Sequence, residues 1–348
     1  MGEPDRRELQ RRLLAWYRAT KRDLSFRRSK DPYAILVAEI VLQRTRVKAG
    51  LPYYERFLAA FPTVRDLAAA SEADVLRVWE GLGFYGRARN LHRAAKAIVE
   101  RHGGRVPADV DALRALPGIG DYTAGAVGSI AFGLPAPAVD GNVTRVLARV
   151  FRIEEDAFRG PGRRRIQDLA AELVPEDAPG EWNQALMELG ATVCVPTSPR
   201  CPICPISSEC AAFGGGVQAS LPRKPAKREV PTVPVVFVIA RRRGAVLLVR
   251  RERGLHAGLF GLPGGERASD EGERDAVRRH LSAIGLQGSG LRILGPVRHA
   301  FSHRTWEGSA FAARVRGTSH GAVWVPAAKL AETPLIPLHR QILGRAMS

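Results

Sequence analysis

Four cysteines, the only ones in the chain, lie close together and could hold one metal centre. They are Cys194, Cys201, Cys204 and Cys210, in a loop of residues 194–210. Structural zinc sites more often use two Cys-x-x-Cys pairs, whereas only Cys201 and Cys204 form such a pair here. The spacing therefore favours one iron–sulfur cluster, with zinc as an alternative. Disulfides are a third interpretation, but the sequence begins without a signal peptide, and we expect reduced thiols.

Glu39 places a carboxyl group within an apolar helical pattern. Its neighbours on the same helix face include Ile35, Leu36 and Leu42. Burial would keep its carboxylic acid protonated near neutral pH, and such an acid can protonate a leaving group. The alternative is a solvated glutamate without a catalytic role, since most helical glutamates are solvated.

A second carboxyl group, Asp140, follows a glycine-rich turn and opens another helix. The turn, Leu-Pro-Gly-Ile-Gly at 116–120, has the form of a helix-hairpin-helix. Gly118 and Gly120 would let backbone N–H groups approach a DNA phosphate. We expect Asp140 to lie near the nucleotide that the hairpin anchors. Two structural alternatives stay open: the turn is only a turn, and Asp140 is only an N-cap.

The elements that must position these residues are of two kinds. Residues 1–213 show apolar residues at helical spacing and no strand alternation. Residues 214–232 are rich in Gly, Pro, Lys and Arg and predict a linker. Residues 233–348 begin with a β-hairpin pattern at 235–249 and continue with a helix near 270–284 and further strands. We predict a mostly α N-terminal domain and an α+β C-terminal domain.

The charge of the chain is strongly positive. It contains 53 Lys and Arg against 35 Asp and Glu, a formal net charge of +18. Such an excess predicts attraction to a polyanion, and nucleic acid is favoured because no apolar run is long enough to cross a bilayer. The alternative is a general preference for arginine in the source genome.

Taken in order, these segments resemble the MutY-type adenine DNA glycosylases, helix-hairpin-helix enzymes of the endonuclease III superfamily. The matching segments are the Glu39 helix, Gly-Leu-Gly-Phe-Tyr at 81–85, the hairpin, Val-Asp-Gly-Asn at 139–142, the helix at 182–191 and the cysteine loop. The resemblance covers nearly the whole chain. It implies a helix-hairpin-helix glycosylase fold with one 4Fe-4S cluster on the four cysteines, followed by a Nudix-like domain.

The resemblance also implies roles for single residues. Glu39 would protonate an adenine swung out of the duplex, and Asp140 would stabilise the resulting sugar cation. Tyr122 and Asn142 would orient the site, and Tyr122 replaces the Schiff-base lysine of the lyase branches, which implies a monofunctional enzyme. Family positions that line the base pocket are matched by Arg22, Phe26, Arg27, Leu42 and Gln184, and those that contact DNA by Gln43, Arg44, Leu82, Phe84, Gly118 and Gly120.

The C-terminal domain carries a further resemblance. Phe301, Ser302 and His303 are similar to the Phe-Ser-His loop by which these enzymes recognise 8-oxoguanine. The helix at 271–281 lacks the paired glutamates of a Nudix hydrolase, so we do not expect pyrophosphate hydrolysis. Phe26, Arg44 and Phe84 depart from the usual Trp, Gln and Tyr, which bears on substrate preference.

We therefore expect a monomeric enzyme of the bacterial cytosol or nucleoid, without membrane attachment. Its partner would be duplex DNA with adenine opposite 8-oxoguanine or guanine. One alternative is a mismatch glycosylase that removes thymine or another base opposite guanine, against which the intact Phe-Ser-His loop argues. Another is a non-catalytic DNA-damage-binding protein, against which the pair Glu39 and Asp140 argues.

Overall fold

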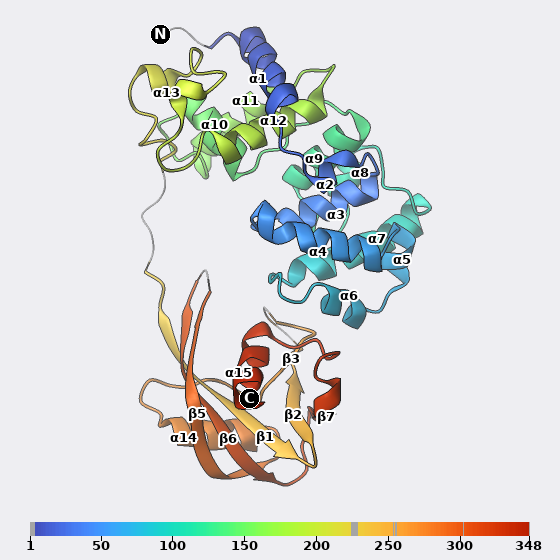
Figure 1. Cartoon of the computed structure of the whole chain (residues 1–348), viewed down its shortest axis with the longest axis vertical. Coiled ribbons are helices and arrows are strands. Elements are labelled where there is room, and N and C mark those ends of the chain that lie inside the picture. Colours follow the sequence, from blue (N-terminus) through green and yellow to red (C-terminus); the bar gives the residue numbers. More distant parts are fainter. Residues whose placement is uncertain (1–3, 224–228, 253, 255, 302, 348) are drawn as a thin grey trace. The chain divides into compact units, whose positions relative to one another are not determined.

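The computed structural model describes residues 4–347 except 224–228, 253, 255 and 302. It divides into two compact units, which are considered separately (Figure 1). The first unit comprises Met1–Ala70 and Arg89–Ala226, and the second comprises Ser71–Ala88 and Lys227–Ser348.

The chain is helical up to the cysteine loop. The helices are α1 (Arg6–Thr20), α2 (Ser25–Arg28), α3 (Pro32–Leu42), α4 (Val47–Ala60), α5 (Val64–Ala69), α6 (Glu72–Val78), α7 (Gly86–His102), α8 (Val110–Arg114), α9 (Asp121–Phe132), α10 (Gly141–Val150), α11 (Gly160–Glu172), α12 (Pro179–Thr192), the 3-10 turn η1 (Cys201–Ile203) and α13 (Ala211–Gly214). Helix α6 and the start of α7 belong to the second unit. Within the described residues, no helix is long and apolar enough to cross a membrane.

Helix α3 is formed by a clear start signal and an apolar sequence. Asp31 accepts hydrogen bonds from the backbone N–H groups of Tyr33 and Ala34, and Pro32 takes the first helical position. Every residue from Tyr33 to Val41 is buried, as an apolar sequence on all faces requires. The helix therefore carries Glu39 into the interior.

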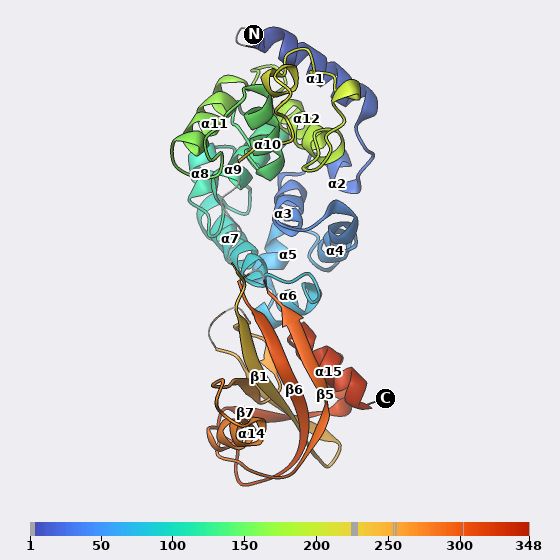
Figure 2. The same ribbon diagram turned by 90° about the vertical axis from the view of Figure 1, so that its left-hand side faces the viewer.

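A hydrophobic core joins α1, α10 and α12. Its largest member is Trp182 of α12, which is fully buried among residues such as Leu13 of α1 and Val146 of α10. The same helices lie side by side in Figures 1 and 2. This packing fixes the start of α10, where Asp140 lies, against the helix that carries Gln184.

The second unit contains a mixed sheet. Its strands are β1 (Thr232–Arg242), β2 (Ala245–Arg250), β3 (Phe260–Gly261), β4 (Gly264–Glu266), β5 (Gln287–Ala300), β6 (Thr305–Arg316) and β7 (Ala322–Pro326), in the order β3-β2-β1-β6-β5 with β4 beside β1 and β7 beside β2. Among these strands, as far as the structure describes them, β1 and β6 pair in parallel and the other pairs are antiparallel. Both residues of the β1–β2 turn, Arg243 and Gly244, have positive φ, the geometry of a type I′ hairpin.

Two helices complete this unit around the sheet. Val236 and Val238 of β1 pack into one core with Val277 of α14 (Glu273–Ser282). Phe237, which alternates with them, stacks on His339 of α15 (Pro337–Met347) at 4.4 Å between ring centroids. Because successive strand residues face opposite sides, the two helices lie on opposite faces. A second 3-10 turn, η2, spans Ala327–Lys329.

The predicted fold class is confirmed, and two details of the predicted domains differ. The expected linker 214–232 is not wholly unpacked: Leu221 is buried and packs with Cys210 and Ala212, because the chain after α13 folds back on the cysteine loop. Ser71–Ala88, expected in the first domain, groups with the second unit. Sequence periodicity indicates helical segments in this part of the chain but not which core they join.

Candidate active site and cluster loop

Glu39 is buried and hydrogen-bonded. Its side chain accepts a hydrogen bond from the Tyr122 hydroxyl at 2.5 Å, and the residue is 8% exposed. Burial, aided by the nearby charge of Asp140, raises the pKa of Glu39 to about 7, although the hydrogen bond from Tyr122 and the charge of Arg27 lower it. The carboxyl group can therefore carry a proton near neutral pH.

Asp140 is both an N-cap and a member of the same site. Its carboxylate accepts from the backbone N–H groups of Asn142 at 2.8 Å and Val143 at 2.7 Å, and from the Asn142 side-chain amide at 2.7 Å. Burial raises the pKa of Asp140, while these hydrogen bonds and Arg145 lower it. Asp140 is therefore the N-cap of α10, and it also lies in the wall of the cavity that contains Glu39.

One cavity in the first unit gathers both carboxyl groups and the expected base pocket. Its lining includes the expected site residues Arg22, Phe26, Arg27, Glu39, Leu42, Tyr122, Asp140, Asn142 and Gln184. Gln184 is held by neighbours, since its side-chain oxygen accepts from the Tyr17 hydroxyl and its amide donates to the carbonyl of Gly180, both at 3.2 Å. Elements from α2 to α12 therefore converge on one pocket.

Glu188 and Arg145 also belong to this region, and sequence reasoning missed them. Glu188 accepts hydrogen bonds from Arg22 and Arg27 in the cavity wall. Arg145 donates to the side-chain oxygen of Asn142 and to the carbonyl of Cys194, both at 2.8 Å. Helical spacing in the sequence could have pointed to both residues, because Glu188 lies one turn after Gln184 and Arg145 lies one turn after Asn142.

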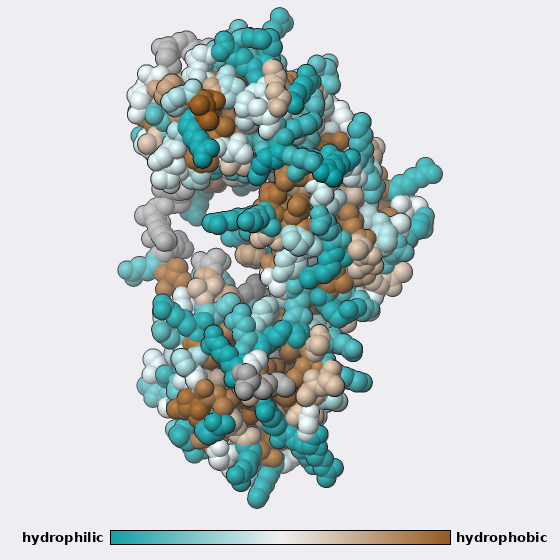
Figure 3. Space-filling view, viewed as in Figure 1, coloured by the Kyte–Doolittle hydropathy of each residue, from teal (hydrophilic) through white to brown (hydrophobic). Residues whose placement is uncertain are grey.

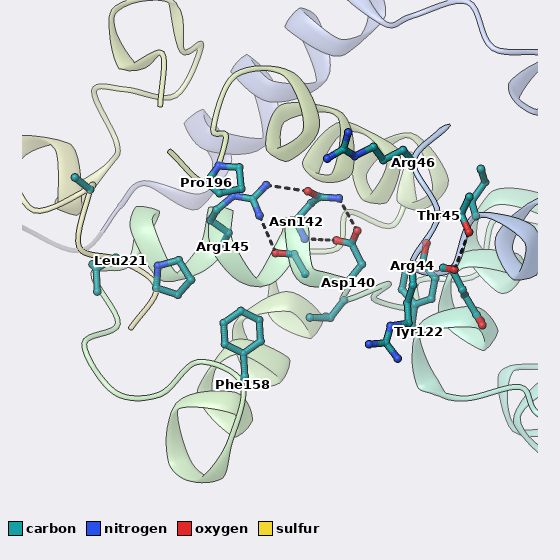
Figure 4. Close-up of a pocket in the computed structure, with 16 residues that line it drawn as sticks. Arg44, Thr45, Arg46, Tyr122, Asp140, Asn142, Arg145, Phe158, Pro196 and Leu221 are labelled. Atoms are coloured by element: carbon teal, nitrogen blue, oxygen red, sulfur yellow. Dashed lines mark hydrogen bonds between the residues drawn. The ribbon is translucent and has the colours of Figure 1, made fainter. Parts of the chain in front are cut away.

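A larger cavity of the first unit also has Asp140 in its wall (Figure 4). Its lining includes Gln43 and Arg44 after α3, Tyr122, and Phe158 before α11. In the figure, Asp140, Asn142 and Arg145 form one chain of hydrogen bonds along the start of α10. Gln43 donates to the Thr123 hydroxyl at 3.0 Å. Two predicted DNA-contacting residues therefore stand beside the predicted catalytic group.

Gly118 and Gly120 of the hairpin are glycines for different structural reasons. Gly118 has φ +77, and a Cβ added to it would lie 2.4 Å from the Asn90 side chain. Gly120 is the N-cap of α9, has φ −98, and makes no side-chain cap hydrogen bond. The N-cap residue thus supplies no side-chain acceptor to the first N–H groups of α9, and such groups can bind a phosphate.

Leu82 and Phe84 lie in a loop of the second unit rather than in the catalytic cavity. Phe84 has φ +48 and is 41% exposed, and the Arg87 guanidinium lies 5.4 Å from its ring centroid. A non-glycine residue with positive φ is uncommon and often marks a functional loop.

Phe301 and His303 lie in the loop between β5 and β6. The Phe301 ring packs against His299 at 4.6 Å and Trp306 at 4.8 Å between centroids, with His303 at 5.9 Å. The Phe301 N–H donates to the carbonyl of Arg304 at 2.8 Å, which closes the loop. Ser302 lies outside the described residues.

All four cysteine side chains line one cavity of the first unit. Arg149 of α10, a further residue that the sequence did not single out, is 2% exposed and donates to Cys194 Sγ at 3.3 Å. Its other acceptors are backbone carbonyls, those of Leu221, Val195 and Pro196. A buried guanidinium needs a counter-charge, and no described carboxylate contacts Arg149. An anionic thiolate-bound group at the cysteines would supply that charge.

Among the described residues, no three His, Cys, Asp or Glu side chains converge as for a single metal ion. The four cysteines that line this cavity are the residues that could hold a thiolate-bound metal group.

Comparison with known proteins identifies the family. The family model described as HhH-GPD superfamily base excision DNA repair protein matches residues 37–195, and the NUDIX domain model matches residues 235–345. A rat protein named adenine DNA glycosylase is 34% identical over 375 residues, which cover 92% of this chain and 73% of the relative. The chain belongs to the adenine DNA glycosylase family. It is accordingly a DNA N-glycosylase of base excision repair.

A human relative bears the same name, and solved structures share the fold of the first unit. The human adenine DNA glycosylase is 37% identical over 349 residues, 84% of this chain and 64% of the relative, so the chain spans less than two thirds of that protein. The structure of a thermostable thymine-DNA glycosylase matches with a TM-score of 0.54 and 30% identity, over 60% of this chain and 97% of that one. An endonuclease III–DNA complex matches with a TM-score of 0.52 at 23% identity, which supports the fold alone.

Proposed function

We propose that this chain removes adenine from duplex DNA, opposite 8-oxoguanine or guanine, by hydrolysing the N-glycosidic bond. The observation that carries the proposal is the burial of Glu39 in the same cavity as Asp140. Two carboxyl groups in different environments supply the acid and the cation stabiliser that glycoside hydrolysis needs. Related proteins in rat and human bear the name adenine DNA glycosylase.

The reaction begins with the adenine turned out of the duplex into the cavity. Glu39 gives its proton to N7 of the base, which makes the base a better leaving group. The bond between the base and C1′ then breaks, and its electron pair leaves with the base. Tyr122 fixes the Glu39 carboxyl group through their hydrogen bond.

The sugar is left as a cation of oxocarbenium character. The Asp140 carboxylate, held by the N–H groups of Asn142 and Val143, stabilises that cation or captures it transiently. Water then adds to C1′, and its proton passes to the Glu39 carboxylate, which restores the acid. The products are free adenine and an abasic site.

We propose that the enzyme is monofunctional. A lyase would need a lysine amine in the cavity to form a Schiff base with the sugar. Among the described residues, the lining of the catalytic cavity contains no lysine. Tyr122, whose pKa burial raises well above its ordinary value, is a hydrogen-bond donor at that place.

The base opposite adenine would be recognised by the loop Phe301–His303. Phe301 of this loop is partly exposed, and its ring packs against Trp306 of β6. Phe301 offers a stacking face, and polar groups beside it can read the N7–H and O8 edge that distinguishes 8-oxoguanine from guanine.

The four cysteines would hold one 4Fe-4S cluster with a structural role. All four line one cavity beside the buried Arg149 guanidinium. The bound cluster would cross-link the loop 194–210, where Pro199 and Arg200 are available to contact DNA.

Removal of thymine opposite guanine is a second candidate. It is favoured by the 30% identity to a thymine-DNA glycosylase structure. That similarity covers 60% of this chain, whereas the similarity to the rat adenine DNA glycosylase covers 92%. Adenine removal is therefore the primary proposal.

The test is a single-turnover excision assay on matched duplexes. These contain adenine opposite 8-oxoguanine, adenine opposite guanine, and thymine opposite guanine, each analysed with and without alkali. We expect adenine release in the first two and strand cleavage only after alkali. Faster release of thymine would overturn the proposed substrate, and cleavage without alkali would overturn the monofunctional mechanism.

A further inference from the structure

Glu188 of α12 is a buried carboxylate that bridges two arginines. It is 1% exposed. Its Oε1 accepts from Arg22 Nε at 2.6 Å, and its Oε2 accepts from Arg22 Nη2 at 2.8 Å and Arg27 Nη2 at 2.6 Å. Burial raises the pKa of Glu188, but the hydrogen bonds from the two arginines lower it by more. The group is therefore a carboxylate at neutral pH, and the three side chains together carry one net positive charge.

This Arg22–Glu188–Arg27 triad lines the same cavity as Glu39. Arg27 is also held by the carbonyl of Arg22 at 3.2 Å and lies over the Tyr17 ring at 5.6 Å. Its side chain is 12% exposed, so solvent screens its charge little. A buried guanidinium favours the charged form of any carboxyl group nearby, and a general acid must avoid that form.

The groups that face Glu39 come from several elements. Tyr122 of α9 donates a hydrogen bond, Asp140 before α10 favours the protonated acid, and Arg27 of α2 opposes it. Val47 of α4, which is uncharged, also lines the cavity. Burial has the largest effect on the protonation of Glu39, and the Tyr122 hydrogen bond and the charges of Asp140 and Arg27 act on the buried group in addition.

We propose that Glu188 is a positioning residue that keeps Glu39 protonated, because its carboxylate offsets the arginine pair at the wall of the acid's own cavity. The inference rests on the proposed function, in which Glu39 is the acid. Glu188 fixes the direction of both guanidiniums and neutralises half of their charge. Without it, Arg22 and Arg27 repel each other and present two uncompensated charges to the cavity.

The test compares pH–rate profiles of single-turnover adenine release for the full chain and three variants. In Glu188→Gln the triad carries two positive charges, so we expect the alkaline limb of the profile to move down by about one pH unit. The rate at pH 8 should then fall about tenfold more than the rate at pH 5.5. In Glu188→Asp the charge stays, so the limb should stay while the rate falls at all pH values.

The double variant Glu188→Gln/Arg27→Gln returns the triad to one positive charge. We expect its alkaline limb to move back toward that of the wild type even though base binding weakens, and it removes the unpaired charge that could unfold the single variant. The inference would be overturned if the alkaline limb of the pH–rate profile stayed in place in Glu188→Gln, or if it moved as far in Glu188→Asp as in Glu188→Gln. These results differ from failure of the proposed function, in which Glu39→Gln would still release adenine.

Discussion

Folding buries Glu39 although its carboxyl group is better solvated in water. Helix α3 is apolar on every face and buried from Tyr33 to Val41, so folding removes the carboxyl group from water. The carboxyl group of Glu39 therefore holds its proton more strongly, since burial raises its pKa from 4.5 to about 7. The same environment that makes it an acid also makes its ionised form unfavourable.

This cost gives a prediction for stability. The pKa is raised on folding, so the folded state is penalised as pH rises from 4.5 to about 7. Glu39→Gln removes the ionisation. It should stabilise the protein relative to wild type by about 2–3 kcal/mol more at pH 8 than at pH 5, since one unit of pKa is about 1.4 kcal/mol.

Denaturant unfolding at both pH values provides the measurement. The matched control is Glu100→Gln, which changes an exposed glutamate of α7 and should show no such difference. An equal effect of Glu39→Gln at pH 5 and pH 8 would mean that Glu39 ionises as freely in the folded chain as in the unfolded one.

At the residue level, the sequence was informative where a residue contradicted its local pattern. Glu39 stands out because it interrupts an apolar helix. Glu188 and Arg145 do not, because the partners that define them are distant: Arg22 lies 166 residues from Glu188, and Cys194 lies 49 residues from Arg145. Only folding brings such pairs together.

The helix-hairpin-helix turn is the element in which backbone geometry is most restrictive. At Gly118 both φ of +77 and the closeness of Asn90 exclude a side chain. At Gly120 neither restriction holds, because φ is −98 and no described atom lies within 4 Å of a Cβ added there. Substitution at each glycine therefore tests whether this turn needs the positive φ of Gly118 or simply a glycine residue.

We predict that Gly118→Ala destabilises the chain by roughly 1–3 kcal/mol and weakens duplex binding, because the turn must distort. Gly120→Ala is the matched control and should cost less than about 1 kcal/mol. Denaturant unfolding and fluorescence anisotropy with a duplex give both quantities. Equal effects of the two substitutions would contradict the role assigned to the positive φ.

The type and order of most elements were predictable, while their packing was not. Apolar spacing identified the helices up to the cysteine loop and the β1–β2 hairpin. It did not reveal that Leu221 folds back on the cysteine loop or that Ser71–Ala88 joins the second unit. Both depend on contacts between segments that are distant in sequence.

At the scale of the whole molecule, the net positive charge and the division into two units both bear on binding of the proposed DNA substrate. Hydrophilic side chains cover much of the face drawn in Figure 3, in keeping with the net charge of +18. The first unit contains the catalytic cavity, and the second contains the loop Phe301–His303. The proposed chemistry and the proposed recognition of the opposite base therefore belong to different units.

This division predicts a separation of function. Phe301→Ala with His303→Ala should reduce the preference for 8-oxoguanine over guanine about tenfold, the value of one lost stacking contact, with little change for adenine opposite guanine. Single-turnover rates on both duplexes measure the preference, with His320→Ala of the same unit as control. Equal slowing on both duplexes would show that the loop serves catalysis or stability instead.

The central claim is that Glu39 donates the proton that releases adenine, and the most direct test is single-turnover adenine release by Glu39→Gln from a duplex with adenine opposite 8-oxoguanine. An amide of the same shape keeps the pocket but has no acidic proton. We predict a rate at least about 100-fold below wild type, with duplex affinity retained. Adenine release at the wild-type rate would contradict the account.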